Sequence, residues 1–128
     1  MKASEIPVPT EADEQITLFH WAAWQSGKYP ELNLLYHVPN GGSRNRIEAA
    51  RLKAQGVKPG VPDIVLPAAR GKYHGLYVEL KRQRGGRISE NQKEWIKGLT
   101  EQGYCAVVCK GYEEAAHAIL NYLEGKAI

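Results

Sequence analysis

The sequence contains no apolar run that approaches the roughly 20 residues needed to cross a membrane, and its first residues form no apolar signal region. It also has only two cysteines, Cys105 and Cys109, among 128 residues. These two share a face of an apparent strand but stand well apart, and no neighbouring side chain completes a zinc site. Buried free thiols in a reducing compartment are the simpler interpretation. We therefore expect a cytoplasmic protein without disulfides.

Internal repeats, a linker and a second domain-sized segment are also missing. A chain of 128 residues is long enough for one domain with one hydrophobic core. Residues 1–9 contain two prolines and few apolar side chains. We therefore predict a flexible N-terminal arm at residues 1–9 and a single domain at residues 10–128.

Hydrophobic periodicity and turn residues predict helices that alternate with strands. Thr10 is expected to cap a first helix that runs to about Gln25, with acidic residues in its first turn. The residues expected to face the core are Ile16, Phe19 and Ala23, with Leu18, Trp21 and Ala22 beside them. The later elements are strands at 34–38, 63–66, 76–81 and 104–109, and helices at 44–55, after Ser89 as far as Gly103, and at 113–123. The predicted order is αβαββαβα.

A turn with the sequence Pro-Asn-Gly-Gly occupies residues 39–42. Ser43 is expected to cap the helix at residues 44–55. Two glycines followed by a basic helix start resemble a phosphate-binding turn, although the motif alone is weak. The helix residues expected to pack inward are Ala49, Ala50 and Leu52.

Acidic and basic side chains occur at related places in two of the predicted strands. Asp63 opens one apolar run, and Glu79 and Lys81 lie two positions apart in the next. Because alternate residues of a strand share a face, Glu79 and Lys81 leave the sheet on one side and Leu80 on the other. If the strands pair, Asp63 meets Glu79. Two carboxylates suit Mg²⁺, and an adjacent lysine can polarise water or stabilise phosphate charge. A half-buried salt bridge between Glu79 and Lys81 is the alternative.

Positive charge is concentrated in the middle of the chain. Residues 44–87 contain eleven Lys or Arg and three acids, and two of those acids are Asp63 and Glu79. A basic field around a small acidic centre attracts phosphates, whereas a solvated basic surface is the alternative reading. The basic segment 82–87 directly follows the strand that carries Glu79. We expect it to contact the DNA backbone without reading sequence.

Ser89 and Gln92 have the spacing of a capping box for the helix that follows, which explains Gln92 structurally. Pro62-Asp63, followed by Glu79-Leu80-Lys81, resembles the signature of the PD-(D/E)xK nuclease superfamily. The VRR-NUC (virus-type replication-repair nuclease) family, in its small stand-alone, phage-like form, is more similar still. The further blocks that carry this resemblance are Asp13-Glu14-Gln15, residues 37–42, residues 56–63 and Ser89-x-x-Gln92-x-x-Trp95.

The resemblance implies a restriction-endonuclease-like α/β core, with a central mixed four-stranded sheet flanked by helices. It also implies a metal-dependent DNA endonuclease that acts on branched DNA such as Holliday junctions, inside a bacterial host cell if a phage encodes it. Asp63, Glu79 and the backbone carbonyl of Leu80 are the expected ligands of Mg²⁺ or Mn²⁺. Lys81 is expected to position or activate water.

The first helix of the resembled family supplies one more acid near the metal, which is Glu14 here, or alternatively Glu11. Gln92 is expected to support the site as well as cap its helix. A homodimer that presents two sites is expected, because so small a domain has limited surface for gripping branched DNA. A non-catalytic DNA-binding module on the same fold is the alternative function, and a nucleotide-binding protein ranks last. The residues expected to contact DNA are Asn40, Arg44, Arg46, Arg82, Arg84 and Arg87.

Overall fold

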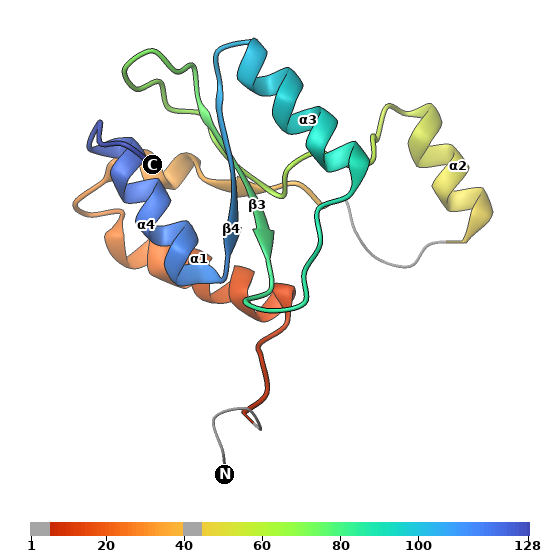
Figure 1. The fold of residues 1–128 in the computed structure, drawn as a ribbon, viewed down its shortest axis with the longest axis horizontal. Helices are drawn as coiled ribbons and strands as arrows, with labels where there is room; N and C mark the ends of the chain where they lie inside the picture. Colours follow the sequence, from red (N-terminus) through yellow and green to blue (C-terminus); the bar gives the residue numbers. More distant parts are fainter. Residues whose placement is uncertain (1–5, 40–44) are drawn as a thin grey trace.

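The computed structural model describes residues 6–39 and 45–128. Their element order matches the predicted αβαββαβα, with one short 3-10 helix added (Figure 1). The elements are α1 (Glu11–Gln25), the 3-10 helix η2 (Pro30–Leu34), β1 (Tyr36–His37), α2 (Arg46–Ala54), β2 (Ile64–Leu66), β3 (Leu76–Lys81), α3 (Glu90–Glu101), β4 (Cys105–Lys110) and α4 (Tyr112–Leu123).

The four strands form one mixed sheet, as predicted, and their order across the sheet is β1-β2-β3-β4. The pairs β1–β2 and β2–β3 are antiparallel, and β3–β4 is parallel. Ile64 lies opposite Val78 in the β2–β3 register. Helices α1 and α4 lie on one side of the sheet and α3 lies on the other (Figure 1). The fold is therefore the predicted nuclease-like α/β fold, with a helical layer on each face of the sheet.

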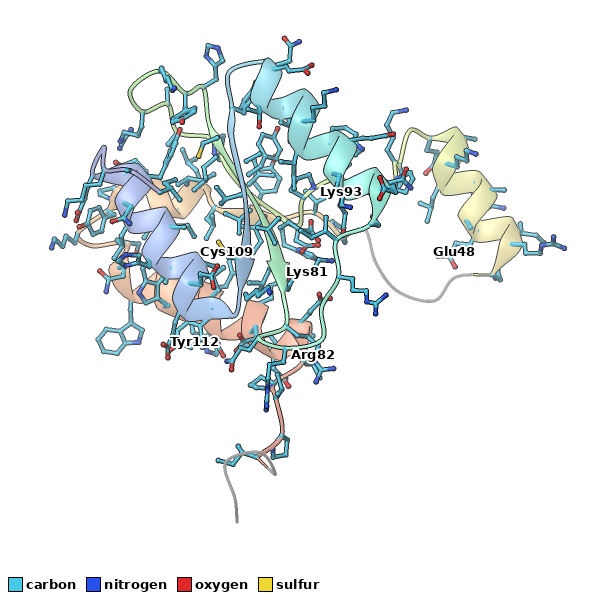
Figure 2. The ribbon with its side chains drawn as sticks, in the orientation of Figure 1. Glu48, Lys81, Arg82, Lys93, Cys109 and Tyr112 are labelled. Carbon is cyan, nitrogen blue, oxygen red and sulfur yellow. The ribbon has the colours of Figure 1, made fainter. Side chains whose placement is uncertain are left out.

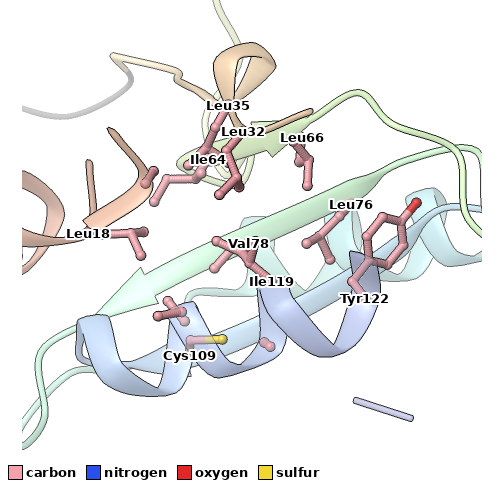
Figure 3. Close-up of a cluster of buried hydrophobic side chains, with 14 of the residues drawn as sticks. Leu18, Leu32, Leu35, Ile64, Leu66, Leu76, Val78, Cys109, Ile119 and Tyr122 are labelled. Carbon is pink, nitrogen blue, oxygen red and sulfur yellow. The ribbon is translucent and has the colours of Figure 1, made fainter. Parts of the chain in front are cut away.

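The main core lies between the sheet and helices α1 and α4, where buried apolar side chains from all these elements meet (Figure 3). Leu76, Val78 and Leu80 of β3 belong to it. Because side chains alternate along a strand, Tyr77, Glu79 and Lys81 must point to the face that α3 covers. Other members of this core are Leu18, Ala22, Ile64, Leu66, Cys109, Ile119 and Tyr122.

The predicted core-facing stripe of α1 is partly wrong. Leu18 and Ala22 are buried as expected, but Ile16 is 56% exposed and Ala23 is exposed as well. The third fully buried residue of the helix is Glu14. Positions 14, 18 and 22 are spaced by four, so they lie on one face. The face of α1 that packs against the rest of the protein therefore includes the Glu14 carboxylate, and Ile16 lies on the exposed side.

Helix α2 begins at Arg46, two residues after the predicted start. The side chain of Asn45 caps it by accepting a hydrogen bond of 2.7 Å from the Glu48 N–H. The predicted cap, Ser43, lies outside the described residues, as does most of the predicted turn at residues 39–42. The end of the helix, at Ala54, agrees with the prediction to within one residue.

The expected inward packing of α2 is wrong. Ala49 and Ala50 are exposed, Leu52 is half-buried, and Ile47 is 74% exposed. The two large apolar residues, Ile47 and Leu52, are five positions apart and face different sides of the helix, so they form no continuous stripe. The helix accordingly stands apart from the sheet and its other helices (Figure 1).

Two further elements differ from expectation. The strand predicted at residues 34–38 shrinks to Tyr36–His37, because the chain from Pro30 to Leu34 forms the 3-10 helix. Residues 6–9 of the predicted arm are described and contain no helix or strand, whereas residues 1–5 lie outside the described part. None of the helices within residues 6–39 and 45–128 has the length and apolar character needed to span a membrane.

Candidate active site

The loop before Asp63 is held tightly against α3. Gly60 has a φ of +91°, and a Cβ at this position would lie 2.6 Å from the backbone carbon of Asn91. Only glycine combines this backbone conformation with so close an approach. Pro62 is almost fully buried in the same loop. The loop and α3 therefore fix the point at which β2 starts.

Asp63 uses both its backbone and its side chain to join three strands. Its carbonyl oxygen accepts hydrogen bonds from the Val38 N–H (2.7 Å) and from Nδ1 of His37 (3.0 Å). Its Oδ2 accepts a hydrogen bond of 3.0 Å from the Leu80 N–H. The β2–β3 ladder begins at the Ile64–Val78 pair. Just beyond that pair, the Asp63 carboxylate, rather than a backbone carbonyl, accepts the hydrogen bond from β3.

Glu79 and Lys81 form a buried pair on the α3 side of the sheet. They are 2% and 8% exposed, and Lys81 Nζ lies 3.4 Å from Glu79 Oε1. Figure 2 shows Lys81 between β3 and α3. The other oxygen, Glu79 Oε2, is buried and finds no hydrogen-bond partner among the described residues. A buried, unpaired carboxylate oxygen is costly, so this atom is the natural place for a ligand to bind.

Gln92 connects this pair to the start of α3. Its Oε1 accepts from the Ser89 N–H (2.8 Å), and Ser89 Oγ accepts from the Gln92 N–H (3.1 Å), which completes the predicted capping box. Because Oε1 of Gln92 is bound to the Ser89 N–H, Nε2 of the same amide points away from Ser89. That atom donates a hydrogen bond of 2.7 Å to Glu79 Oε1. One side chain therefore caps the helix and holds the carboxylate.

The environment of Glu79 favours its protonated form. Burial is the main cause, the nearby Asp63 carboxylate adds to it, and Lys81 opposes it, which together raise the Glu79 pKa from 4.5 to about 7. A divalent cation at this position would have the opposite effect, because it would stabilise the ionised carboxylate. Glu79 and Asp63 are thus close enough to influence each other, as pairing of the strands predicts.

The donor set suits a hard divalent cation. In an extended strand the N–H and C=O of one residue point to the same side. Since the Leu80 N–H points to Asp63, the Leu80 carbonyl faces the same side. Mg²⁺ and Mn²⁺ prefer such carboxylate and carbonyl oxygens, with water or substrate completing the coordination. No three His, Cys, Asp or Glu side chains of the described residues group closely enough to hold a metal ion, so the carboxylate pair and a backbone oxygen are what the chain offers.

Glu14 occupies a different environment from the one expected by resemblance. It is 3% exposed, and its Oε2 accepts a hydrogen bond of 2.9 Å from the Tyr112 N–H at the start of α4. Nε2 of Gln83 lies 3.4 Å from its Oε1. Gly111 leaves the room for this contact, since a Cβ there would lie 2.5 Å from Glu14 Oε2. The structure thus does not bring Glu14 into one group with Asp63 and Glu79; the alternative residue, Glu11, is exposed.

Four of the residues predicted to contact DNA belong to the described part of the chain, and all four lie on the surface. Arg82, Arg84 and Arg87 are exposed in the segment after β3, and Arg46 is exposed at the start of α2. A guanidinium nitrogen of Arg82 donates a hydrogen bond of 3.2 Å to the Val8 carbonyl, so the N-terminal segment runs beside this basic loop. Asn40 and Arg44 lie outside the described residues.

Sequence reasoning missed the contacts that depend on distant segments. The bond from the Leu80 N–H to Asp63 could have been anticipated from the strand pairing, because Asp63 directly precedes β2 and Ile64 lies opposite Val78. The contact of Gln83 with Glu14 has no local signal, since it joins residues that are 69 positions apart.

Comparisons with known proteins identify a family and a similar solved structure. The model of the VRR-NUC domain matches residues 5–113. A solved structure described as a VRR_NUC domain protein is 35% identical in sequence and superposes with a TM-score of 0.80, covering 92% of this chain and 91% of its own. A search of the curated proteins found no match.

Proposed function

This chain belongs to the VRR-NUC family of PD-(D/E)xK-type nucleases, and on that premise we propose that it is a divalent-metal-dependent DNA endonuclease that selects branched DNA, such as Holliday junctions. The observation that carries the proposal is the buried Glu79 Oε2, which has no partner among the described residues although a carboxylate and an ammonium group lie beside it. Nearly all buried polar atoms in native structures have a hydrogen-bond partner, so an unpartnered carboxylate oxygen indicates a ligand site.

In the proposed mechanism, Asp63, Glu79 Oε2 and the Leu80 carbonyl would hold Mg²⁺ or Mn²⁺. The bound ion would supply the Lewis acidity that activates water and neutralises phosphate charge. Lys81 is aligned by Glu79 Oε1 and can direct its remaining N–H groups at the attacking water or the phosphate. The water oxygen attacks phosphorus in line and gives up a proton to solvent, while the bond to the leaving oxygen breaks and that oxygen takes up a proton from solvent.

Two further side chains have supporting roles in this proposal. Gln92 keeps Glu79 Oε1 occupied, so that only Oε2 is available to a ligand. Glu14 acts through the backbone: it anchors the start of α4 and Gln83, which follows β3 directly. It thereby fixes the end of the strand that carries Glu79 and Lys81.

Exposed arginines on both sides of the site support DNA as the substrate. Arg82, Arg84 and Arg87 follow the catalytic strand, and Arg46 lies on the separate helix α2. Contacts from such side chains go mainly to phosphates, which position DNA without specifying its sequence. We also propose that Asn40 and Arg44, which lie outside the described residues, contact the DNA. Selection by DNA shape, rather than by sequence, follows from this kind of contact.

We also propose that the protein acts as a homodimer, because two symmetric sites can engage two strands of a junction and two-fold pairing is the commonest oligomer. Exposed aromatic residues are candidates for the contact between subunits. Trp24 is 88% exposed and Tyr36 is 49% exposed.

A panel of branched and linear DNAs with Mg²⁺, with Mn²⁺ and with a chelator tests the proposal. Metal-dependent cleavage of a four-way junction is expected, and Asp63→Asn or Lys81→Met should lower its rate by at least about 100-fold while DNA binding persists. Lys93→Met is the matched control, because Lys93 is an exposed lysine on α3. Failure on every substrate with both metals would favour a non-catalytic DNA-binding module, although pure binding gains nothing from carboxylates that face phosphate.

A further inference from the structure

A cavity lies beside the candidate active site, between α3 and the two loops that precede and follow α2. Its volume is about 390 Å³. Apart from one lysine, its main lining side chains are apolar, and one of them is an indole ring. These residues are Val38, Pro39, Val57, Lys58, Val61 and Trp95. A space of this size falls in the range of pockets that bind small organic groups.

The position of the cavity connects it to the carboxylates. Val61 is two residues before Asp63, and Trp95 is three residues after Gln92 on α3. Residues three apart on a helix share a face and are about one turn, roughly 5 Å, apart. Gln92 contacts Glu79, so one wall residue of the cavity, Trp95, lies about one turn along α3 from the residue that holds this carboxylate.

The walls of the cavity are fixed before any ligand arrives. Gly60, between Val57 and Val61, approaches the backbone of Asn91 so closely that a Cβ would collide with it. This contact pins the loop wall of the cavity to the first turn of α3. A preformed wall can bind a rigid planar group without first being ordered.

The surroundings of the cavity are cationic. Helix α2 ends at Ala54, two residues before Gly56, and carries the exposed residues Arg46, Arg51 and Lys53. An occupant must therefore combine a flat apolar part with a negatively charged backbone on at least one side. Nucleotides of DNA have this composition, and bases stack on aromatic side chains whatever their identity.

We propose that this cavity binds an unstacked nucleobase of the DNA, next to the phosphate that is cleaved. The inference rests on the proposed function and adds a reason for selecting branched DNA. Bases within a continuous duplex are paired and stacked, and extracting one costs free energy, whereas a branch point or a bulge already offers a base that is partly free. Selection by shape then becomes selection for an available base.

Binding measured in a chelator tests the proposal independently of cleavage. The probes are two duplexes that contain 2-aminopurine, either unpaired in a single-nucleotide bulge or fully paired. The bulged duplex should bind about tenfold more tightly, with quenching of its fluorescence as the base stacks on Trp95. Val57→Phe should fill the cavity and remove both effects, leaving affinity for the paired duplex unchanged. Val57 is 37% exposed, so this change should be tolerated.

Ile16→Phe, at a residue that is 56% exposed on α1, is the matched control and should retain the preference. Equal affinity for the two duplexes would overturn the proposal, as would equal effects of Val57→Phe and Ile16→Phe. The proposal would also be overturned if Val57→Phe removed the preference for the bulged duplex and also converted a dimer to a monomer in sedimentation. That result would assign the cavity to a second copy of the chain. Base capture without any cleavage would refute only the nuclease activity, whereas cleavage without base preference would refute only the cavity.

Discussion

Replacing Glu79 by glutamine should alter how the stability of the metal-free protein depends on pH. In the folded protein the Glu79 pKa is raised from 4.5 to about 7, chiefly by burial and then by the charge of Asp63. Between these two values the folded state keeps a proton that the unfolded chain has lost. The contribution of Glu79 to the free energy of unfolding is therefore full below pH 4.5 and disappears as the pH rises through 7.

The size of the effect follows from the same shift. About 2.5 pKa units correspond to about 3 kcal/mol in total, of which about 2.5 kcal/mol falls between pH 5 and pH 8. Glutamine does not titrate, so Glu79→Gln removes this dependence. The free energy of unfolding of the variant, minus that of the wild type, should increase by about 2.5 kcal/mol over this range. Any constant cost of leaving Lys81 without its partner cancels in the comparison.

Urea unfolding at four pH values between 5 and 8, in the presence of a chelator, measures this difference. The control is Glu90→Gln, because Glu90 has a side chain that is 85% exposed and pairs with Lys93 only at the surface. Its difference from the wild type should stay constant. A flat or falling difference for Glu79→Gln would refute the reasoning, since it would mean that burial and Asp63 do not disfavour the charged carboxylate.

Four further predictions concern the site, the loop, the core and the DNA surface. Gln92→Ala should raise the Mg²⁺ concentration needed for half-maximal cleavage by about 10- to 100-fold, as metal titration will measure. Gly60→Ala should lower the free energy of unfolding by more than about 1 kcal/mol in urea, because a Cβ collides with Asn91. Leu18→Ala should cost about 3 kcal/mol in the same assay, whereas a loss below about 1 kcal/mol would contradict its burial. Arg84→Gln should lower the salt dependence of DNA binding by about one unit of slope.

The geometry of the β3 carboxylate could be anticipated because it depends on local alternation. Glu79 and Lys81 are two residues apart in a strand, so any fold that retains the strand places them on one face. The capping box of Gln92 is equally local, and its spacing from Ser89 is visible in the sequence. The contact between Gln92 and Glu79 was expected only through the resemblance, because it depends on how α3 packs against the sheet.

The errors concern features that distant segments decide. Glu14 is buried where its carboxylate accepts a hydrogen bond from the N–H of Tyr112, 98 residues later. A periodicity count that treats Glu14 as polar and Ile16 as apolar therefore turns α1 the wrong way. Helix α2 shows the reverse case, since Ala49 and Ala50 are apolar but exposed, and no other helix or strand of the described residues packs against this helix. The cavity beside Trp95 is also invisible in the sequence, because its walls come from three separate segments.

Gln92 both caps α3 and holds Glu79, so folding of the first turn of this helix and correct orientation of the Glu79 carboxylate occur together. If the first turn of this helix frays, the Ser89–Gln92 box opens and Glu79 loses the amide that orients it. Fraying of a helix end costs far less than global unfolding. Hydrogen exchange at the amides of that turn should therefore become faster as the fraction of molecules competent for cleavage falls, and a bound metal should slow it.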